Sequence, residues 1–159
     1  QPIYKAGPIR LADLPEAPAK PVKKAASNLE ECFHRAAVKC RLRYETVMSI
    51  GRHESGNFTS KLWFGGWNPA GIEFRQFKTV RCIGRMGKRG RWAKFASQED
   101  GILALAEVLS KERYDRARRT DNPEAQLRAI YAAHYCEPGY NWLPQVIRHM
   151  RKVQSTYGE

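Results

Sequence analysis

The sequence predicts an α+β fold that is mostly helical and contains a small β-hairpin insertion. The first observation is that apolar residues recur at helical spacing in several segments on both sides of the middle of the chain. The second is that residues 57–96 carry aromatic residues, glycines and short β-prone runs, which indicate loops and a hairpin. The length of 159 residues fits one compact domain, which can bury a core without metals or disulfides.

Residues 1–26 differ from the rest of the chain and precede the predicted domain. A segment without apolar periodicity cannot bury enough surface to offset the entropy lost on ordering it. We therefore expect an extended tail or linker over 1–26 and a folded domain over 27–159. The prolines of this segment are interleaved with alanine and lysine: Pro2, Pro8, Pro15, Pro18 and Pro21.

The predicted domain begins with two helices. Ser27 and Glu30 have the spacing of a capping box, and the apolar residues that follow recur at helical spacing. A second helix is expected over about 44–53. It ends at Glu54-Ser55-Gly56, because glycine readily adopts the left-handed conformation that stops a helix.

Helices return after the insertion. Ser97 with Asp100 gives another capping pattern, and the segment after it has one apolar face. Asn122 followed by Pro123 is a favourable helix start, because proline fits the first helical position. A final amphipathic helix is expected to carry its apolar residues on one face: Leu143, Val146, Ile147, Met150 and Val153.

The chain is strongly basic. Lysine and arginine outnumber aspartate and glutamate by 28 to 16, which gives a formal net charge of +12. Such an excess favours a polyanionic partner such as nucleic acid, anionic lipid or an acidic cell wall. Eight basic residues and no acidic ones lie between Arg75 and Lys94, either as a solvated loop or as a substrate-facing surface. No stretch approaches the roughly 18 consecutive apolar residues of a membrane span.

The four cysteines match no standard zinc pattern with the histidines, and no metal or organic cofactor is implied. An even count favours disulfides in an exported protein, whereas buried free thiols are expected in a cytosolic one. Cys32 and Cys40 cannot bridge within one helix, since the rise alone separates them by about 12 Å. Any bridges are therefore expected to be long-range, for instance from Cys82 or Cys136 to one of the first pair.

Glu54 is the candidate catalytic residue, because it lies at the C-terminal end of an apolar helix. Hydrophobic neighbours and the negative end of the helix dipole both disfavour its ionised form and so raise its pKa. A general acid needs this property, since it must still be protonated when it meets a glycosidic oxygen. Taken alone, Glu-Ser-Gly at a helix end is a weak signal and is more often an ordinary surface glutamate.

The segment 54–58, Glu-Ser-Gly-Asn-Phe, resembles the lysozyme-like superfamily, in which this glutamate is the acid. The later segments resemble one branch, the glucosaminidase-like domains of glycoside hydrolase family 73. The resemblance covers about residues 28–155 in the family's order. Its matching segments are Trp-Phe-Gly-Gly at 63–66, Ala-Gly-Ile-Glu-Phe at 70–74, and the runs 92–102, 109–114 and 135–140.

This resemblance implies a lysozyme-like domain that hydrolyses peptidoglycan at the β-1,4 bond on the GlcNAc side, with Glu54 as general acid. Many members carry a second acidic residue in the β insertion, but residues 74–96 here contain none. A mechanism with two carboxylates would have to recruit Glu73, Glu99 or Glu137.

Substrate assistance is the alternative that we favour. In that mechanism the N-acetyl group of the sugar attacks the anomeric carbon. The resemblance gives Tyr135 the role of orienting or stabilising that group, so Tyr135 is the second candidate catalytic residue. A packed core tyrosine is the competing interpretation of Tyr135.

Aromatic residues are dense around the motif, and sugar rings present apolar C–H faces that stack on such side chains. The expected partners are peptidoglycan glycan strands and an anionic wall polymer. They would be bound by a monomer in the periplasm or outside the cell, in an autolysin, phage, secretion or flagellar setting. The predicted substrate-binding residues are Phe64, Trp67, Asn68, Gly71, Ile72, Phe74, Trp92 and Tyr140.

Two other functions fit parts of the sequence. Residues 31–37 and the run to Glu54 also resemble lytic transglycosylases, but the Gly-Leu-Met-Gln-Leu element of that family is absent. Gly-Ile-Glu-Phe stands in its place at 71–74. The third hypothesis is a non-catalytic module that binds wall polymer or nucleic acid, since a basic groove with aromatic residues suits both.

Overall fold

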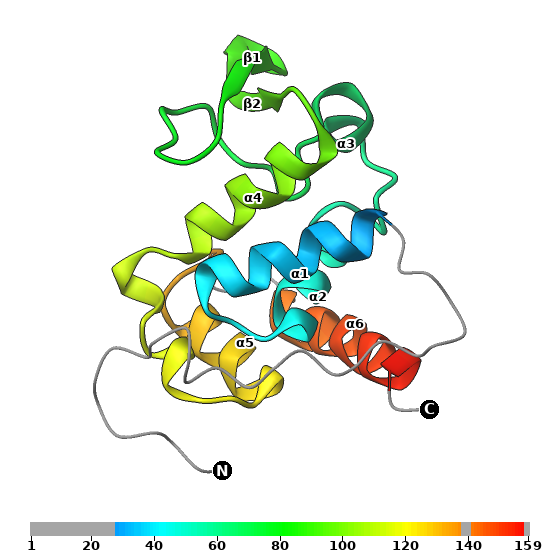
Figure 1. The fold of residues 1–159 in the computed structure, drawn as a ribbon, viewed down its shortest axis with the longest axis vertical. Helices are drawn as coiled ribbons and strands as arrows, with labels where there is room; N and C mark the ends of the chain where they lie inside the picture. Colours follow the sequence, from blue (N-terminus) through cyan, green and yellow to red (C-terminus); the bar gives the residue numbers. More distant parts are fainter. Residues whose placement is uncertain (1–27, 138–140, 158–159) are drawn as a thin grey trace.

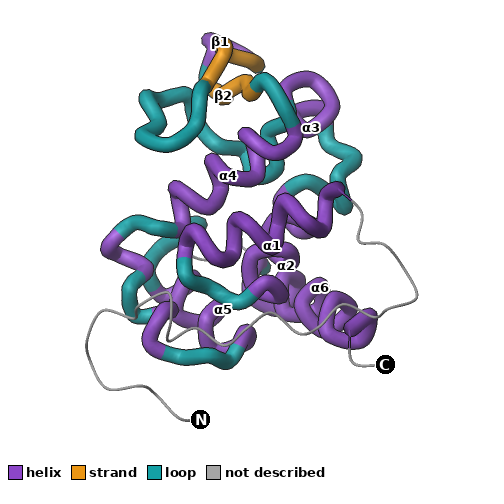
Figure 2. The backbone as a smooth tube through the Cα atoms, in the orientation of Figure 1, coloured by secondary structure: helices purple, strands orange, loops and turns teal. Residues whose placement is uncertain are grey.

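The computed structural model describes residues 28–137 and 141–157. Within these ranges the chain forms a helical body with a two-stranded antiparallel sheet at one end (Figure 1). Loops and short helical segments surround the sheet, whereas longer helices make up the body (Figure 2). The predicted fold class is therefore confirmed. The tail predicted over 1–26 and the cap predicted at Ser27 lie outside the described residues.

Five helices of the described chain build the body. Helix α1 (Asn28–Cys40) packs along α4 (Gln98–Leu109), and α2 (Tyr44–Glu54) packs along α6 (Trp142–Tyr157). Helix α5 (Pro123–Ala132) contacts both α2 and α6. None of the helices in the described ranges is both long enough and apolar enough to cross a lipid bilayer.

Helix α2 carries the candidate acid at its last position and is the most deeply buried element. Residues 44–51 are all buried, so their polar groups must find partners inside the fold. The hydroxyl of Thr46 donates to Oε1 of Gln126 at 2.7 Å, and that of Ser49 donates to the carbonyl of Thr46 at 2.8 Å. The first contact ties the N-terminal half of α2 to α5, and the second lies within α2.

The predicted starts of α4 and α5 are confirmed. The hydroxyl of Ser97 accepts a hydrogen bond from the N–H of Asp100 at 3.1 Å. The side-chain oxygen of Asn122 accepts one from the N–H of Ala125 at 2.9 Å, with proline at the first position of α5. Both caps satisfy N–H groups that a helix leaves without an internal partner.

The hairpin lies inside the predicted insertion. Strand β1 (Cys82–Met86) pairs with β2 (Trp92–Phe95) in antiparallel register. The segment 72–74 runs beside β2, since the N–H of Ala93 donates to the carbonyl of Ile72 at 2.9 Å. The sheet therefore positions the segment that the family resemblance singled out.

One helix of this region was not predicted. Helix α3 (Lys61–Gly66) lies where the sequence indicated only loops and a hairpin, so the prediction was wrong there. The hydroxyl of Ser60 caps it by accepting from the N–H of Trp63 at 3.1 Å. Six residues are too few to show a helical period, and the two glycines at its end disfavour helix. Three single-turn 3-10 helices were missed for similar reasons: η2 (Lys88–Gly90), η3 (Glu112–Tyr114) and η4 (Ala117–Arg119).

Gly101 lets α4 approach the loop after α3 very closely. A Cβ atom at this position would lie 1.7 Å from the carbonyl oxygen of Trp67, far inside van der Waals contact. Trp67 itself has a φ of 52°, in the left-handed region. The hairpin end of the molecule is thus fixed to α4 by a contact that only glycine permits.

The four cysteines are free thiols, which contradicts the expectation of long-range disulfides. Cys32 and Cys40 both point into the core from α1. Burial raises the pKa of Cys40 to about 12, so this thiol stays protonated and unreactive at neutral pH. The structure therefore matches the alternative of buried free thiols at these two positions.

Candidate active site

Glu54 is positioned by the motif that follows it. Ser55 is completely buried; its hydroxyl donates to the carbonyl of Gly51 at 2.6 Å and accepts from the N–H of Phe58 at 2.8 Å. Residues 56–58 all have positive φ, with values of 58°, 58° and 63°. Glycine adopts this conformation without strain and asparagine tolerates it, so Phe58 is the strained residue of the turn. The buried serine thus holds the chain in the sharp turn directly after the glutamate.

The carboxyl group of Glu54 is half-buried and has one strong partner. Its Oε1 accepts a hydrogen bond of 2.7 Å from Nε1 of Trp142, the first residue of α6. Burial raises the pKa of Glu54, and the hydrogen bond from Trp142 opposes that rise. The predicted rise of the pKa is confirmed in direction, and desolvation is its largest cause.

The partner also determines where the proton of Glu54 lies. An indole N–H is a donor only, so Oε1 must act as an acceptor in this contact. The carbonyl oxygen of a neutral carboxyl group is a better acceptor than its hydroxyl oxygen, so the proton of Glu54 is favoured on Oε2. The oxygen that does not face Trp142 is the one that can donate a proton.

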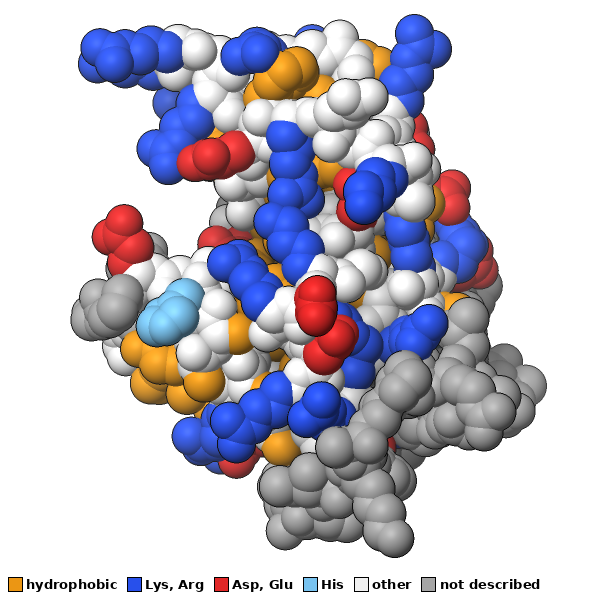
Figure 3. Space-filling view, turned by 90° about the vertical axis from the view of Figure 1, so that its left-hand side faces the viewer, with side chains coloured by type: hydrophobic (Ala, Val, Ile, Leu, Met, Phe, Trp, Pro, Cys, Tyr) orange, Lys and Arg blue, Asp and Glu red, His pale blue; other side chains and the backbone are white. Residues whose placement is uncertain are grey.

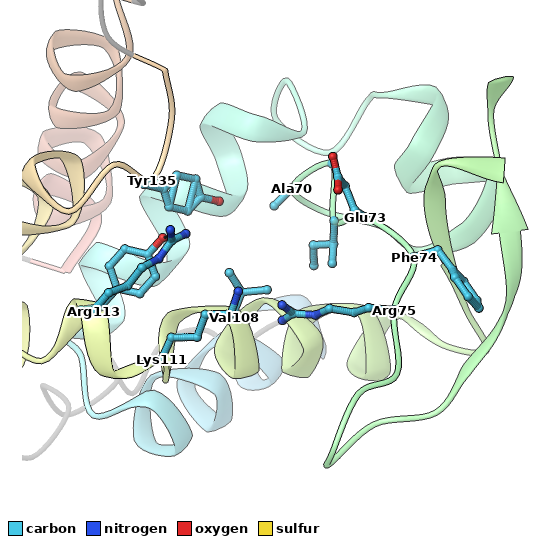
Figure 4. Close-up of a pocket in the computed structure, with 11 residues that line it drawn as sticks. Ala70, Glu73, Phe74, Arg75, Val108, Lys111, Arg113 and Tyr135 are labelled. Carbon is cyan, nitrogen blue, oxygen red and sulfur yellow. The ribbon is translucent and has the colours of Figure 1, made fainter. Parts of the chain in front are cut away.

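Tyr135 lies beside this pair. Its ring stacks on Trp142 with 5.2 Å between centroids, and lies 6.3 Å from the ring of Tyr114. Figure 4 shows its hydroxyl pointing toward a pocket. Burial and then the charge of Glu54 raise the pKa of Tyr135 well above its ordinary value, so the hydroxyl stays protonated. Tyr135 both packs against the core and presents a polar group.

The pocket has a volume of about 410 Å³. Four of the predicted site residues line it: Gly71, Ile72, Phe74 and Tyr135. In Figure 4, Ala70 and Glu73 lie on one side, and Arg75, Val108 and Lys111 lie on the other, along α4. The space-filling view shows a notch between the hairpin end and the body (Figure 3). The remaining lining residues are Arg113 and Tyr114.

A half-buried acid beside an open pocket is what a glycosidase requires. The family model for glucosaminidases, described as mannosyl-glycoprotein endo-beta-N-acetylglucosaminidase, matches residues 30–155. The chain belongs to the glucosaminidase family. The protein is therefore a glycoside hydrolase, as the resemblance implied.

Solved structures show the same fold as this glucosaminidase. The glycoside hydrolase domain of FlgJ from Salmonella typhimurium has a TM-score of 0.64 at 12% identity, covering 83% of this chain and 87% of that one. A C-terminally truncated form of that domain gives a TM-score of 0.61 at 12% identity, covering 81% and 95%. No curated protein sequence matches the chain.

Asn68 does not have the predicted position in the glucosaminidase site. Its side chain is 0% exposed, and its amide donates to the carbonyls of Ile72 and Ala93, each at 2.9 Å. Its Oδ1 accepts from the N–H groups of Ile72 at 2.8 Å and Ala70 at 3.4 Å. No donor remains for a sugar hydroxyl, so the expectation of direct contact was wrong. Asn68 instead ties the pocket-lining segment to β2.

The other predicted aromatic residues lie outside the lining of the pocket. Phe64 is 71% exposed on α3. Trp67 is half-buried, with its ring 5.2 Å from that of Trp63. Trp92 is also half-buried, with the guanidinium of Arg91 at 4.5 Å over its ring. The prediction for Tyr140 lies outside the described residues.

The three acids considered as second carboxylates occupy different places. Glu73 lines the pocket and pairs with Arg91 at 2.9 Å. Glu99 pairs with Arg35 at 2.8 Å and does not line it. Glu137 is exposed in the loop after Tyr135. Of the three, the geometry brings only Glu73 into the pocket.

Several residues of the glucosaminidase site were not predicted. Trp142 was missed because a tryptophan at a helix start carries no signal that it reaches a glutamate from another helix. Arg75 belongs to the basic run for which a substrate-facing surface was one alternative, whereas Lys111 was not singled out; the side chains of both line the pocket. Among the described residues, no group of three His, Cys, Asp or Glu side chains is arranged to hold a metal ion.

Proposed function

We propose that the protein hydrolyses peptidoglycan strands at the β-1,4 bond on the GlcNAc side, with Glu54 as general acid. The observation that carries this proposal is the hydrogen bond between Trp142 and the half-buried Glu54. Glu54 does not itself line the pocket, but its charge adds to burial in raising the pKa of Tyr135 in the pocket wall. Membership of the glucosaminidase family supports the choice of bond. Peptidoglycan lies outside the cytoplasmic membrane, so we propose a monomer that works in the periplasm or outside the cell.

The acid step follows from the two oxygens of Glu54. Oε2 donates its proton to the glycosidic oxygen as the bond to the anomeric carbon breaks, which leaves the leaving sugar with a neutral hydroxyl. The carboxylate that forms keeps its hydrogen bond from Trp142. Because this bond favours the ionised form, it helps the proton to leave.

The second step depends on the group that meets the anomeric carbon. We favour the N-acetyl group of the sugar, because the pocket contains the hydroxyl of Tyr135, which stays neutral and can hydrogen-bond an amide. The oxygen of this group bonds to the anomeric carbon as the glycosidic bond breaks; water then displaces it and returns a proton to the Glu54 carboxylate. The two displacements retain the anomeric configuration, whereas direct attack by water inverts it. Glu73 is the alternative in a mechanism with two carboxylates.

Product analysis tests the proposed bond. Purified peptidoglycan is digested, and the new sugar ends are identified by mass spectrometry with and without borohydride reduction. We expect ends of reducible GlcNAc. Reducible MurNAc would indicate a muramidase, and anhydro ends that resist borohydride would indicate a lytic transglycosylase; either result would overturn the proposed bond. A zymogram of Glu54→Gln beside the wild type separates an enzyme from a binding module.

A further inference from the structure

A second pocket adjoins the one beside Tyr135. It has a volume of about 480 Å³, and Arg75 and Lys111 line both pockets. The side chains of Arg75 and Lys111 therefore form a wall that the two pockets share, which is called the shared wall below. The other residues around the second pocket are Lys39, Gln76, Lys78, Thr79, Glu107 and Ser110.

The shared wall is cationic, and its cations form no ion pairs among the described residues. Arg113 lines the first pocket together with Arg75 and Lys111, and none of the three forms an ion pair with the described residues. Burial and then the charges of Arg75 and Arg113 lower the pKa of Lys111, which shows that the cations lie close enough to repel one another. Like charges are therefore held close together here.

The acids nearby are already engaged. The carboxylate of Glu107 accepts from the backbone N–H groups of Lys78 and Thr79 at 2.7–3.0 Å, and from the hydroxyl of Thr79 at 2.7 Å. Glu73 pairs with Arg91 at 2.9 Å. Both acids stay ionised, but their partners are other groups: Glu107 interacts with Lys39, and Glu73 pairs with Arg91. Neither acid shifts the pKa of Lys111.

The two arginines are held in place by aromatic rings. The guanidinium of Arg75 lies 5.0 Å from the ring centroid of Phe77. That of Arg113 lies 4.7 Å from the ring of Tyr114 and donates to its hydroxyl at 2.5 Å. Such contacts reduce the entropy that a cation loses when it binds an anion.

We propose that Arg75, Lys111 and Arg113 form a subsite for an anionic group attached to the glycan, namely a carboxylate of the peptide stem. This inference rests on the proposed function, since it takes the sugar chain to lie beside Tyr135. The peptide stem of the neighbouring sugar would then lie along the protein surface and reach Arg75 and Lys111. Guanidinium groups bind carboxylates through paired hydrogen bonds, and a bound anion would relieve the repulsion among the cations.

The test compares substrates with and without peptide stems. Arg75→Gln and Lys111→Gln are assayed on intact peptidoglycan and on glycan strands stripped of peptides by an amidase. The controls are Arg148→Gln and Lys152→Gln, which remove the same charges from α6 outside both pockets. The preference is the ratio of kcat/KM on intact peptidoglycan to kcat/KM on the stripped strands. We expect this ratio to fall about tenfold or more in Arg75→Gln and Lys111→Gln only, because KM for intact peptidoglycan rises. Equal losses on both substrates, or no loss, would overturn the subsite.

Wall polymers with phosphate groups offer the same anionic chemistry. The assay is therefore repeated on sacculi from which such polymers have been extracted with acid. An effect that persists after extraction supports the peptide carboxylate, whereas one that disappears overturns that assignment in favour of phosphate.

A binding measurement separates failure of the subsite from failure of the proposed function. In the Glu54→Gln background, retention on insoluble peptidoglycan should fall when Lys111→Gln is added and should not fall when Lys152→Gln is added. This result does not depend on which bond is cut. The melting temperature of Lys111→Gln should equal or exceed that of the wild type, because a repelled charge is removed; a drop of several degrees would give Lys111 a structural role instead.

Discussion

The indole nitrogen of Trp142 donates a hydrogen bond of 2.7 Å to Oε1 of Glu54, although the two residues are 88 positions apart in the chain. The contact joins the last residue of α2 to the first residue of α6. The two helices pack along each other, so the orientation of the candidate acid depends on how α2 and α6 are assembled.

Replacing Trp142 by Phe should shift the pH dependence of catalysis. The hydrogen bond lowers the pKa of Glu54, so its loss should raise that pKa further. A general acid is active while protonated, and the alkaline limb of the rate profile should therefore move to higher pH. We also expect kcat to fall roughly tenfold, because the proton is no longer favoured on Oε2.

Rates of wall lysis measured across the pH range check this prediction. Trp63→Phe is the matched control. It makes the same replacement at another buried tryptophan, whose ring packs on Phe58 and does not bond to Glu54. An alkaline limb that moves equally in both variants, or moves toward lower pH in Trp142→Phe, would contradict the assigned role.

Glu54→Gln should lower the rate at least roughly a hundredfold and leave the fold as stable as before, or more stable, at neutral pH. Burial raises the pKa of Glu54 above its ordinary value of 4.5. The folded state thus holds this proton more tightly than the unfolded chain. The resulting stability is present below the ordinary value and is lost as the pH rises through the folded pKa.

Melting temperatures at two pH values test this linkage. At about pH 7 the neutral glutamine avoids the buried charge, so the variant should melt at the same temperature as the wild type or higher. At about pH 4 that advantage should disappear. A variant that gains stability on acidification relative to the wild type would reverse the expected sign.

The helices and the raised pKa of Glu54 could be predicted from the sequence, because their signals are local. Ser97 and Asn122 cap helices through residues three positions away, and Glu54 lies at the end of its own apolar helix. The contacts that complete the site are not local. Trp142 reaches Glu54 from another helix, and Asn68 bonds to backbone groups of both its own loop and β2.

Asn68 and Phe64 should behave in opposite ways on substitution. Asn68→Ala leaves buried carbonyl and N–H groups without partners, which should destabilise the fold by about 2–4 kcal/mol. Phe64→Ala removes a side chain that is 71% exposed, so stability should change by less than about 0.5 kcal/mol. Denaturant unfolding measures both values.

Substrate retention gives the second half of that comparison. If Phe64 stacks on sugar rings, Phe64→Ala should bind insoluble peptidoglycan several-fold more weakly although its stability is intact. Normal retention would remove Phe64 from the substrate-binding set, and an unfolding free energy of Asn68→Ala equal to the wild type would refute its structural role.

Gly101→Ala should be strongly destabilising. The added methyl group would lie 1.7 Å from the carbonyl oxygen of Trp67, so α4 or the loop after α3 must move. We expect a loss of at least about 2 kcal/mol, which corresponds to a melting temperature lower by roughly 5 °C or more. Gly84→Ala is the control, because its new methyl would meet only the Lys94 side chain, at 4.0 Å. Similar melting temperatures for the two variants would contradict the close contact.

The wall of the pocket and the acid belong to separate parts of the molecule. Glu54 and Trp142 come from the helical body, whereas the segment 70–75 is attached to β2 through Asn68. Mutations along that segment can therefore change which glycan decorations are accepted while the proton donor stays intact. In evolution, such a division allows the range of accepted substrates to change by small steps, and in the laboratory it makes the segment a region to diversify or exchange.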